Sequence, residues 1–294
     1  MGDTKLKNLG RLALFSAAVL WGFSFVAMKS VLSGIPTLYV LAIRFCGAAL
    51  ILLPACARKL KSIDVSCFLG GALMGAALLA AYLFQTYGLR LTTPGKNAFL
   101  TSAYCVIVPF LYWVYIKRKP DKFNAAAAAI CIAGIGLISL DSDLRIGPGD
   151  ALTICCGLFF AVHIVITAKA VEKRDPVMLA MLQFVVAGLL ALIGALIIEP
   201  FPSGVGAPDV WAMVFLTVVS TAACLLMQVF GQKYTPPSQA AVIMTLESVF
   251  GAISSVVIYH EVLTLRLLFG FALTFAAVII SETKLSFISN LQTH

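Results

Sequence analysis

The feature that most constrains this chain is the near absence of charge from ten long stretches of its sequence. Each stretch contains at most one charged residue and approaches about 20 largely apolar residues, the length that a helix needs to cross a bilayer. Only 12% of all residues are charged, against about 25% in soluble domains. We therefore predict an all-α integral membrane protein with ten transmembrane helices.

The ten predicted spans are joined by short connections, so no soluble domain is expected in any loop. They cover residues 12–28, 30–57, 65–89, 97–116, 123–140, 151–168, 176–198, 210–232, 234–259 and 267–281. Arg44 interrupts the second span and Glu247 the ninth. The first span is followed by Lys29 and further spans instead of a small-residue cleavage site, so we expect it to remain in the mature protein.

Basic side chains are distributed unevenly between the two sides of the predicted bundle. With a cytoplasmic N-terminus, the inner segments hold fifteen of the 21 Lys and Arg residues, and the outer segments hold Lys29, Arg90, Lys96, Arg145 and Arg266. Cytoplasmic loops of membrane proteins carry such an excess. We therefore expect a multi-pass protein of the cell inner (plasma) membrane with both termini cytoplasmic, and no nucleic-acid partner despite the net charge of +8.

The eight cysteines are scattered through the predicted spans and show no metal-type pairing in a loop. Cys155 and Cys156 are adjacent, but neighbouring residues of a helix point about 100° apart and chelate a metal poorly. We interpret the cysteines as small packing residues, with a thiol or metal site at this pair as the alternative. Neither a metal nor a cofactor is expected.

An internal repeat divides the chain into residues 1–143 and 144–294, with five spans in each half. At an offset of 143 residues, the segment 88–98 matches 231–241 in Gly, a basic residue, Thr, Pro and Ala. Because five is an odd number, the second half must enter the membrane from the opposite side. Inverted repeats are a common construction of secondary transporters, whose binding site lies between the halves. A duplication preserved only for packing is the alternative.

Several loose motifs, in order and spacing, resemble the two EamA repeats of the drug/metabolite transporter superfamily. They are WGFSFV at 21–26 with Lys29, RF at 44–45, the segment 88–98 with Pro109, LESVF at 246–250, and HE at 260–261. The resemblance implies two inverted five-helix bundles around a cavity lined mainly by spans 1, 3, 4, 6, 8 and 9. It also implies export or uptake of amino acids or other metabolites. Lys117-Arg118-Lys119 and Ser248 depart from the family pattern.

Charged side chains at bilayer depth are candidates for function, because they are costly to insert. Glu247 lies ten residues past Pro237, about 15 Å along a helix and so near the midplane. It could exchange a proton during transport or hold a cationic group of the solute. The alternative is a permanent structural ion pair with Arg44, which we place outside the main cavity because the resemblance places helix 2 there.

His163 is the remaining titratable candidate within a span, either as a solute ligand or as a neutral imidazole bonded to a neighbouring helix. The other candidate solute-binding residues are polar or aromatic and fall on expected cavity helices: Trp21, Ser24, Tyr82, Gln85, Asn97, Thr101, Tyr104, Gln228 and Thr245. Asn97, Thr101 and Tyr104 are spaced by four and three residues and should share a helix face. Each of these residues could instead serve helix packing.

These features together predict a secondary active transporter that moves a small organic solute, an amino acid or related metabolite, by alternating access across the lipid bilayer. The driving force is either the gradient of the solute itself or a proton gradient, and one chain should suffice as a monomer. The sequence has no phosphate loop and no nucleophile motif, so we do not expect an enzyme. A facilitative channel, a multidrug efflux permease and a non-transporting receptor stay open as alternatives.

Overall fold

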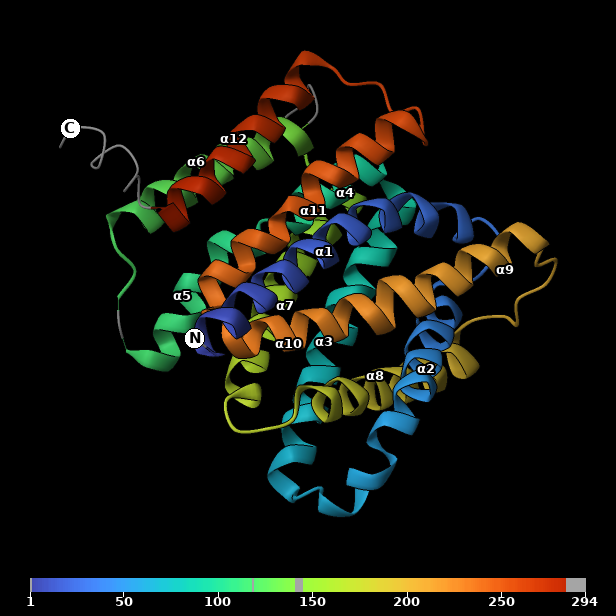
Figure 1. The fold of residues 1–294 in the computed structure, drawn as a ribbon. Helices are drawn as coiled ribbons and strands as arrows, with labels where there is room; N and C mark the ends of the chain where they lie inside the picture. The colour runs from blue at the N-terminus through green and yellow to red at the C-terminus, as the bar shows by residue number, and fades with distance from the viewer. Residues whose placement is uncertain (1, 118, 141–144, 284–294) are drawn as a thin grey trace.

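The structure is a computed structural model that describes residues 2–117, 119–140 and 145–283 (Figure 1). Within these ranges the regular structure is helical and no strand is formed. The helices in chain order are α1 (Gly2–Val31), α2 (Thr37–Cys56), η1 (Ala57–Ser62), α3 (Val65–Leu91), α4 (Pro94–Thr101), α5 (Tyr104–Ile116), α6 (Lys122–Ser139), α7 (Pro148–Val171), α8 (Pro176–Ile198), α9 (Ala207–Val214), η2 (Phe215–Ala223), α10 (Cys224–Tyr234), α11 (Pro237–Val257) and α12 (Leu265–Thr283).

In the described part of the chain, nine helical stretches are long and apolar enough to cross a membrane, and the shorter apolar helix Leu265–Ile280 makes the tenth. This confirms an all-α multi-span protein. Two of the spans are not continuous α-helices as the sequence suggested. The fourth span breaks between α4 and α5, and the eighth contains the nine-residue π-helix η2 between α9 and α10.

Several helices begin at residues that bond to the free backbone amides of the first turn or that need no such bond. Asp64, Asp121 and Asp175 accept hydrogen bonds from backbone amides of the first turns of α3, α6 and α8. Proline begins α8 and α11 at Pro176 and Pro237, where its missing N–H leaves no intrahelical bond unmade. The apolar runs between these signals form the spans.

Each of the main contacts between a helix of the first half and a helix of the second has an equivalent contact in which the two halves have changed places. Helix α3 packs against α7 and α10 against α1, while α4 and α5 pack against α7 and α11 against α1. The pairs α2 with α8 and α6 with α12 each join equivalent spans of the two halves, and Figure 1 shows both pairs side by side. The expected boundary between the halves, at residues 143 and 144, lies outside the described residues.

Helices α2 and α8 are tied together at both ends. At one end the Glu199 carboxylate accepts a hydrogen bond from the Leu38 amide at 2.7 Å, which supplies the cap that α2 lacks. At the other end Lys59 forms an ion pair with Asp175. Burial raises the pKa of the Asp175 carboxyl, but the bonds from Lys59 and two backbone amides outweigh it and hold the pKa below its usual range.

The matched glycines Gly88 and Gly231 mark equivalent helix crossings. A Cβ atom added to Gly88 in α3 would lie 2.8 Å from the Gly149 carbonyl oxygen of α7. A Cβ atom added to Gly231 in α10 would lie 2.9 Å from the Gly10 carbonyl oxygen of α1. Side chains cannot be accommodated at such distances, so these glycines let the backbones of the two halves approach closely.

We predict that Gly88→Ala destabilises the protein by about 1–3 kcal/mol, because the methyl group must displace the α7 backbone. Gly136→Ala is the matched control, since its nearest neighbour would be the flexible end of Leu140 at 3.5 Å. The measurement is thermal unfolding of the purified protein in detergent. Equal melting temperatures for the two variants would contradict the close crossing.

Candidate functional site

A cavity lies between the two halves and is lined from α1, α2, α3, α5, α7, α10 and α11. These elements belong to the spans implied by the family resemblance, with α2 added through Arg44. The residues singled out from the sequence that line the cavity are Trp21, Ser24, Arg44, Tyr82, Gln85, Tyr104, Gln228 and Glu247. The structure thus gathers most of the polar and aromatic candidates around one space.

The remaining candidates lie outside the lining, in contacts between or within helices. Asn97 donates to the Thr153 hydroxyl at 2.8 Å, and Thr101 contacts the Cys156 thiol at 3.3 Å, so both join α4 to α7. The Thr245 hydroxyl donates to a backbone carbonyl of its own helix.

His163 also lies outside the lining, on the face of α7 toward α8. Its Nε2 atom lies 2.9 Å from Gln183 Oε1 of α8, and both side chains are fully buried. This geometry corresponds to the packing alternative, an imidazole bonded to a neighbouring helix.

Sequence reasoning missed several lining residues, most of them apolar: Met28, Thr86, Leu89, Phe160, Ile164 and Met244. Helical periodicity carries a signal for some of them. Met28 lies seven residues after Trp21, and Leu89 lies seven after Tyr82, so each pair falls on one helix face. A search of the positions three, four and seven residues from each polar candidate would therefore have found Met28 and Leu89.

The break between α4 and α5 explains why Tyr104 reaches the cavity and Thr101 does not. Through Ser102 and Ala103 the backbone makes bonds from Ala103 N to Leu100 O and from Val106 N to Ala103 O, which span three residues instead of four. Such bonds wind the chain more tightly than an α-helix. The single helix face expected for Asn97, Thr101 and Tyr104 is therefore not formed.

Arg44 lies fully inside the protein and lines the cavity, not outside it as the family resemblance suggested. Its side chain is 2% exposed. The guanidinium Nε donates to Thr221 Oγ1 at 2.8 Å, and Nη2 donates to Ser220 Oγ at 3.3 Å. The Tyr82 ring lies 4.9 Å from the guanidinium carbon, within the range of a cation–π interaction.

Glu247 lines the same cavity from α11 and is 6% exposed. Its carboxylate lies beside the Tyr104 hydroxyl. Among the described residues, no carboxylate lies within ion-pair distance of Arg44, so the alternative of a permanent ion pair with Glu247 is not formed in this structure. Arg44 has hydroxyl and aromatic partners instead.

Three aromatic rings connect the surroundings of the two charges. Tyr82, beside Arg44, packs edge-on against Phe160 with ring centroids 5.4 Å apart, and Phe160 lies 6.2 Å from the Tyr104 ring. Tyr104 in turn lies beside Glu247. The cavity therefore presents a cation and an acidic group at separate places along an aromatic wall.

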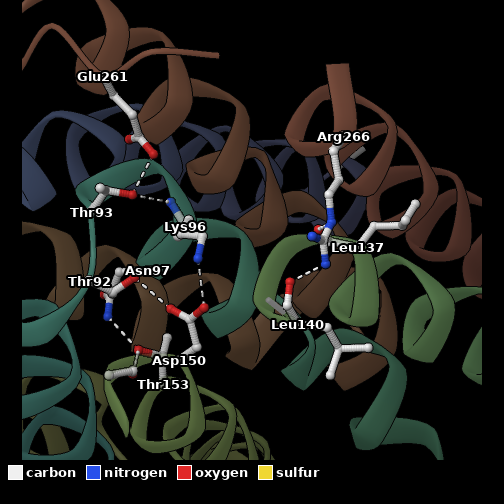
Figure 2. A network of polar contacts seen from close by, with 11 residues as sticks. Thr92, Thr93, Lys96, Asn97, Leu137, Leu140, Asp150, Thr153, Glu261 and Arg266 are labelled. Atoms are coloured by element: carbon white, nitrogen blue, oxygen red, sulfur yellow. Dashed lines mark hydrogen bonds and ion pairs between the residues drawn. The ribbon is translucent and has the colours of Figure 1, made fainter. Parts of the chain in front are cut away.

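A polar network closes the helix ends beyond Leu89 at one end of the cavity (Figure 2). Lys96, at the start of α4, forms a 2.8 Å ion pair with Asp150 in the first turn of α7. The Thr92 hydroxyl donates to the other oxygen of this carboxylate, and Lys29 donates to the Thr92 carbonyl at 2.8 Å. The network thus ties the α3–α4 turn of the first half to α7 of the second.

Glu261, from the turn between α11 and α12, joins the same end of the molecule. Its carboxylate accepts hydrogen bonds from the Thr93 hydroxyl, the Gly95 amide and the Ser255 hydroxyl. It therefore caps α4 from outside and orients its own turn.

The described residues contain no group of three or more His, Cys, Asp or Glu side chains that could hold a metal ion. Cys156 is buried against Thr101, whereas Cys155 is exposed on another face of α7. The adjacent thiols therefore do not converge on one point.

Both the sequence and the fold are similar to those of known proteins. The sequence model of the EamA-like transporter family matches twice, at residues 8–140 and 147–283, on either side of the expected boundary between the halves. An uncharacterized transporter of Archaeoglobus fulgidus is 32% identical over 274 residues, 93% of this chain and 85% of the relative. The uncharacterized transporter YoaV of Bacillus subtilis is 21% identical, over 88% of this chain and 91% of the relative.

The fold is similar to that of a solved crystal structure. The TM-score is 0.71 at 16% sequence identity, over 94% of this chain and 96% of that chain. At this level of identity the likeness shows the arrangement of helices and not the solute.

We predict that Asp150→Asn loosens the end of the cavity that the polar network closes. Lys96 loses its charged partner, and an unsatisfied partly buried group costs about 1–3 kcal/mol, or about ten- to a hundredfold in an opening equilibrium. Hydrogen exchange should accelerate in the first turns of α4 and α7. Asp209→Asn is the control, because that carboxylate accepts from Gly206 within its own helix cap. Unchanged exchange in Asp150→Asn would show that the ion pair does not hold this end closed.

Proposed function

The chain belongs to the EamA-like transporter family, and from this premise we propose that it is a secondary carrier of a small organic solute such as an amino acid or related metabolite. It is a multi-pass membrane protein, and its relatives are named transporters. We place the solute in the central cavity and assign no catalytic role to the chain. One chain contains the whole lining, which supports a monomer as the working unit.

The observation that carries this proposal is the presence of a basic and an acidic side chain in one buried cavity. Arg44 and Glu247 both line it, yet each has neutral partners. Charges are costly to bury and are kept within membrane proteins mainly on solute and ion pathways. A zwitterionic solute would complement both groups, with its carboxylate toward Arg44 and its ammonium group toward Glu247.

Alternating access is supported by the exchange relation between the halves. The crossing of α3 with α7 at Gly88 and the crossing of α10 with α1 at Gly231 are equivalent contacts in the two halves. We propose that one crossing opens as the other closes, which alternates access to the cavity. With both termini in the cytoplasm of a plasma membrane, the Lys96–Asp150 network lies on the outer side.

Glu247 has two roles that this geometry supports. The carboxylate could bind and release a proton in each cycle, or it could stay ionised and hold the ammonium group of the solute. Its position next to the Tyr104 hydroxyl inside the cavity suits both. Only the first role couples transport to a pH gradient, so the two can be separated by experiment.

A second candidate function is efflux of hydrophobic compounds. The aromatic wall of Tyr82, Phe160 and Tyr104, together with Phe25 and Met244, favours it. Flexible methionine and flat aromatic surfaces accept apolar molecules of varied shape. A multidrug permease would tolerate removal of either cavity charge, whereas a carrier of zwitterions would not.

We predict that Glu247→Gln abolishes concentrative uptake driven by a pH gradient in reconstituted liposomes, because glutamine cannot release a proton. Solute counterflow persists if Glu247 acts only as the proton site, and it is weakened if the carboxylate also holds the ammonium group of the solute. The assay uses labelled amino acids and related metabolites. Glu199→Gln serves as the control, since that carboxylate bonds to α2 and Tyr87 outside the cavity. Proton-driven uptake by Glu247→Gln equal to the unsubstituted protein would refute the coupling role. Absence of flux for the whole panel would refute the carrier itself.

A further inference from the structure

The eighth span contains a π-helical segment that faces the cavity residues of the first half. Segment η2 covers nine residues, whereas π-helix in proteins is mostly limited to single turns inserted into α-helices, frequently at functional sites. Ser220 and Thr221 lie in this segment and are fully buried. The segment packs against both α1 and α2.

Three hydrogen bonds join this segment to two cavity-lining residues. Arg44 donates from Nε to Thr221 Oγ1 and from Nη2 to Ser220 Oγ. Trp21 donates from its indole Nε1 to the Ser220 backbone carbonyl at 2.8 Å. The π-helical turn therefore fixes the positions of a cation and a large aromatic ring that belong to other helices.

The Thr221 hydroxyl is oriented by a bond of its own. It donates to the Leu216 carbonyl at 2.7 Å, five residues earlier, the spacing of a π-helical turn. With its hydrogen used in this way, the hydroxyl can only accept from the guanidinium. A regular α-helix pairs residues four apart, so this bond depends on the wider turn.

These neutral contacts leave the positive charge of Arg44 uncompensated. Guanidinium carries five N–H donors and stays charged in proteins. The oxygen acceptors on Ser220 and Thr221 are neutral hydroxyls, and the Arg44 Nη1 atom lies 4.0 Å from the Met28 sulfur. Among the described residues, no carboxylate lies within ion-pair distance of the guanidinium. A buried guanidinium of this kind is suited to a planar anion that accepts two parallel bonds.

We infer that η2 positions Arg44 to bind the carboxylate of the transported solute, with Ser220 and Thr221 as positioning residues. This inference rests on the proposed carrier function and adds the segment that holds Arg44 in place for the carboxylate. The solute class becomes carboxylates and zwitterions. The corresponding esters and amines lack the anion and are poor substrates.

The test compares solutes that differ only in the carboxylate. The probes are the standard amino acids, their methyl esters and the amines that lack the carboxylate, measured by thermal shift and by counterflow in liposomes. The unsubstituted protein should prefer the acid over its ester and its amine by about tenfold or more in KM, as expected for loss of hydrogen bonds to a charged group.

Variants of the π-helical turn separate positioning from general stability. Thr221→Val should raise KM for the acid about tenfold, leave the maximal rate unchanged and leave ester transport unaffected, because the hydroxyl that holds the guanidinium is lost together with its own bond to the Leu216 carbonyl. Thr221→Ser keeps the hydroxyl and should behave like the unsubstituted protein. Thr217→Val is the matched control, since Thr217 lies in the same segment and its methyl group packs on Gly47.

The outcomes distinguish this inference from the proposed function. If no probe moves or binds, the carrier function fails and the inference fails with it. If solutes move but acids, esters and amines have equal KM, the carrier stands and carboxylate recognition by Arg44 is overturned. If Thr221→Val and Thr217→Val reduce all fluxes equally, the segment is structural and the positioning role is overturned.

Discussion

The lack of water in the bilayer interior is the constraint on which the rest of this structure depends. Every backbone N–H and C=O at that depth needs an internal partner, so irregular backbone is tolerated only where protein surrounds it. Both irregular segments obey this rule. Ser102 and Ala103, at the break between α4 and α5, are buried. Ser220 in η2 is also buried, and its backbone carbonyl accepts a hydrogen bond from the Trp21 indole. The break between α4 and α5 brings Tyr104 to the cavity, and η2 holds Arg44 there.

The same constraint explains the arrangement of charge. An ion pair between Arg44 and Glu247 would have neutralised both groups and left a polar but electrically inert cavity. Instead, hydroxyl groups of η2 hold the guanidinium, Tyr104 lies beside the carboxylate, and Phe160 packs between the two tyrosines. Holding charges apart costs stability in the empty protein. A solute that carries both opposite charges offsets this cost on binding, which links the charge separation to selectivity.

The two halves contribute differently to their equivalent contacts. The crossings at Gly88 and Gly231 rely on the same backbone approach, and an ion pair between Lys96 and Asp150 lies near the first. The aligned position to Lys96 in the second half is Gln239, which carries no charge. A duplicated fold can thus keep its geometry while the residues around its two crossings diverge.

The sequence by itself determined the helical class, the spans and the polar candidates, because hydrophobic length and charge spacing act locally along the chain. Helical periodicity also places Met28 and Leu89 on the faces of Trp21 and Tyr82, although they are found only when those faces are followed along the helix. Tertiary structure decided which candidates face the cavity: it turned Tyr104 inward at a helix break, left His163 against Gln183, and brought Arg44 onto η2. Those outcomes depend on contacts between helices far apart in the chain, and such contacts leave no local pattern in the sequence.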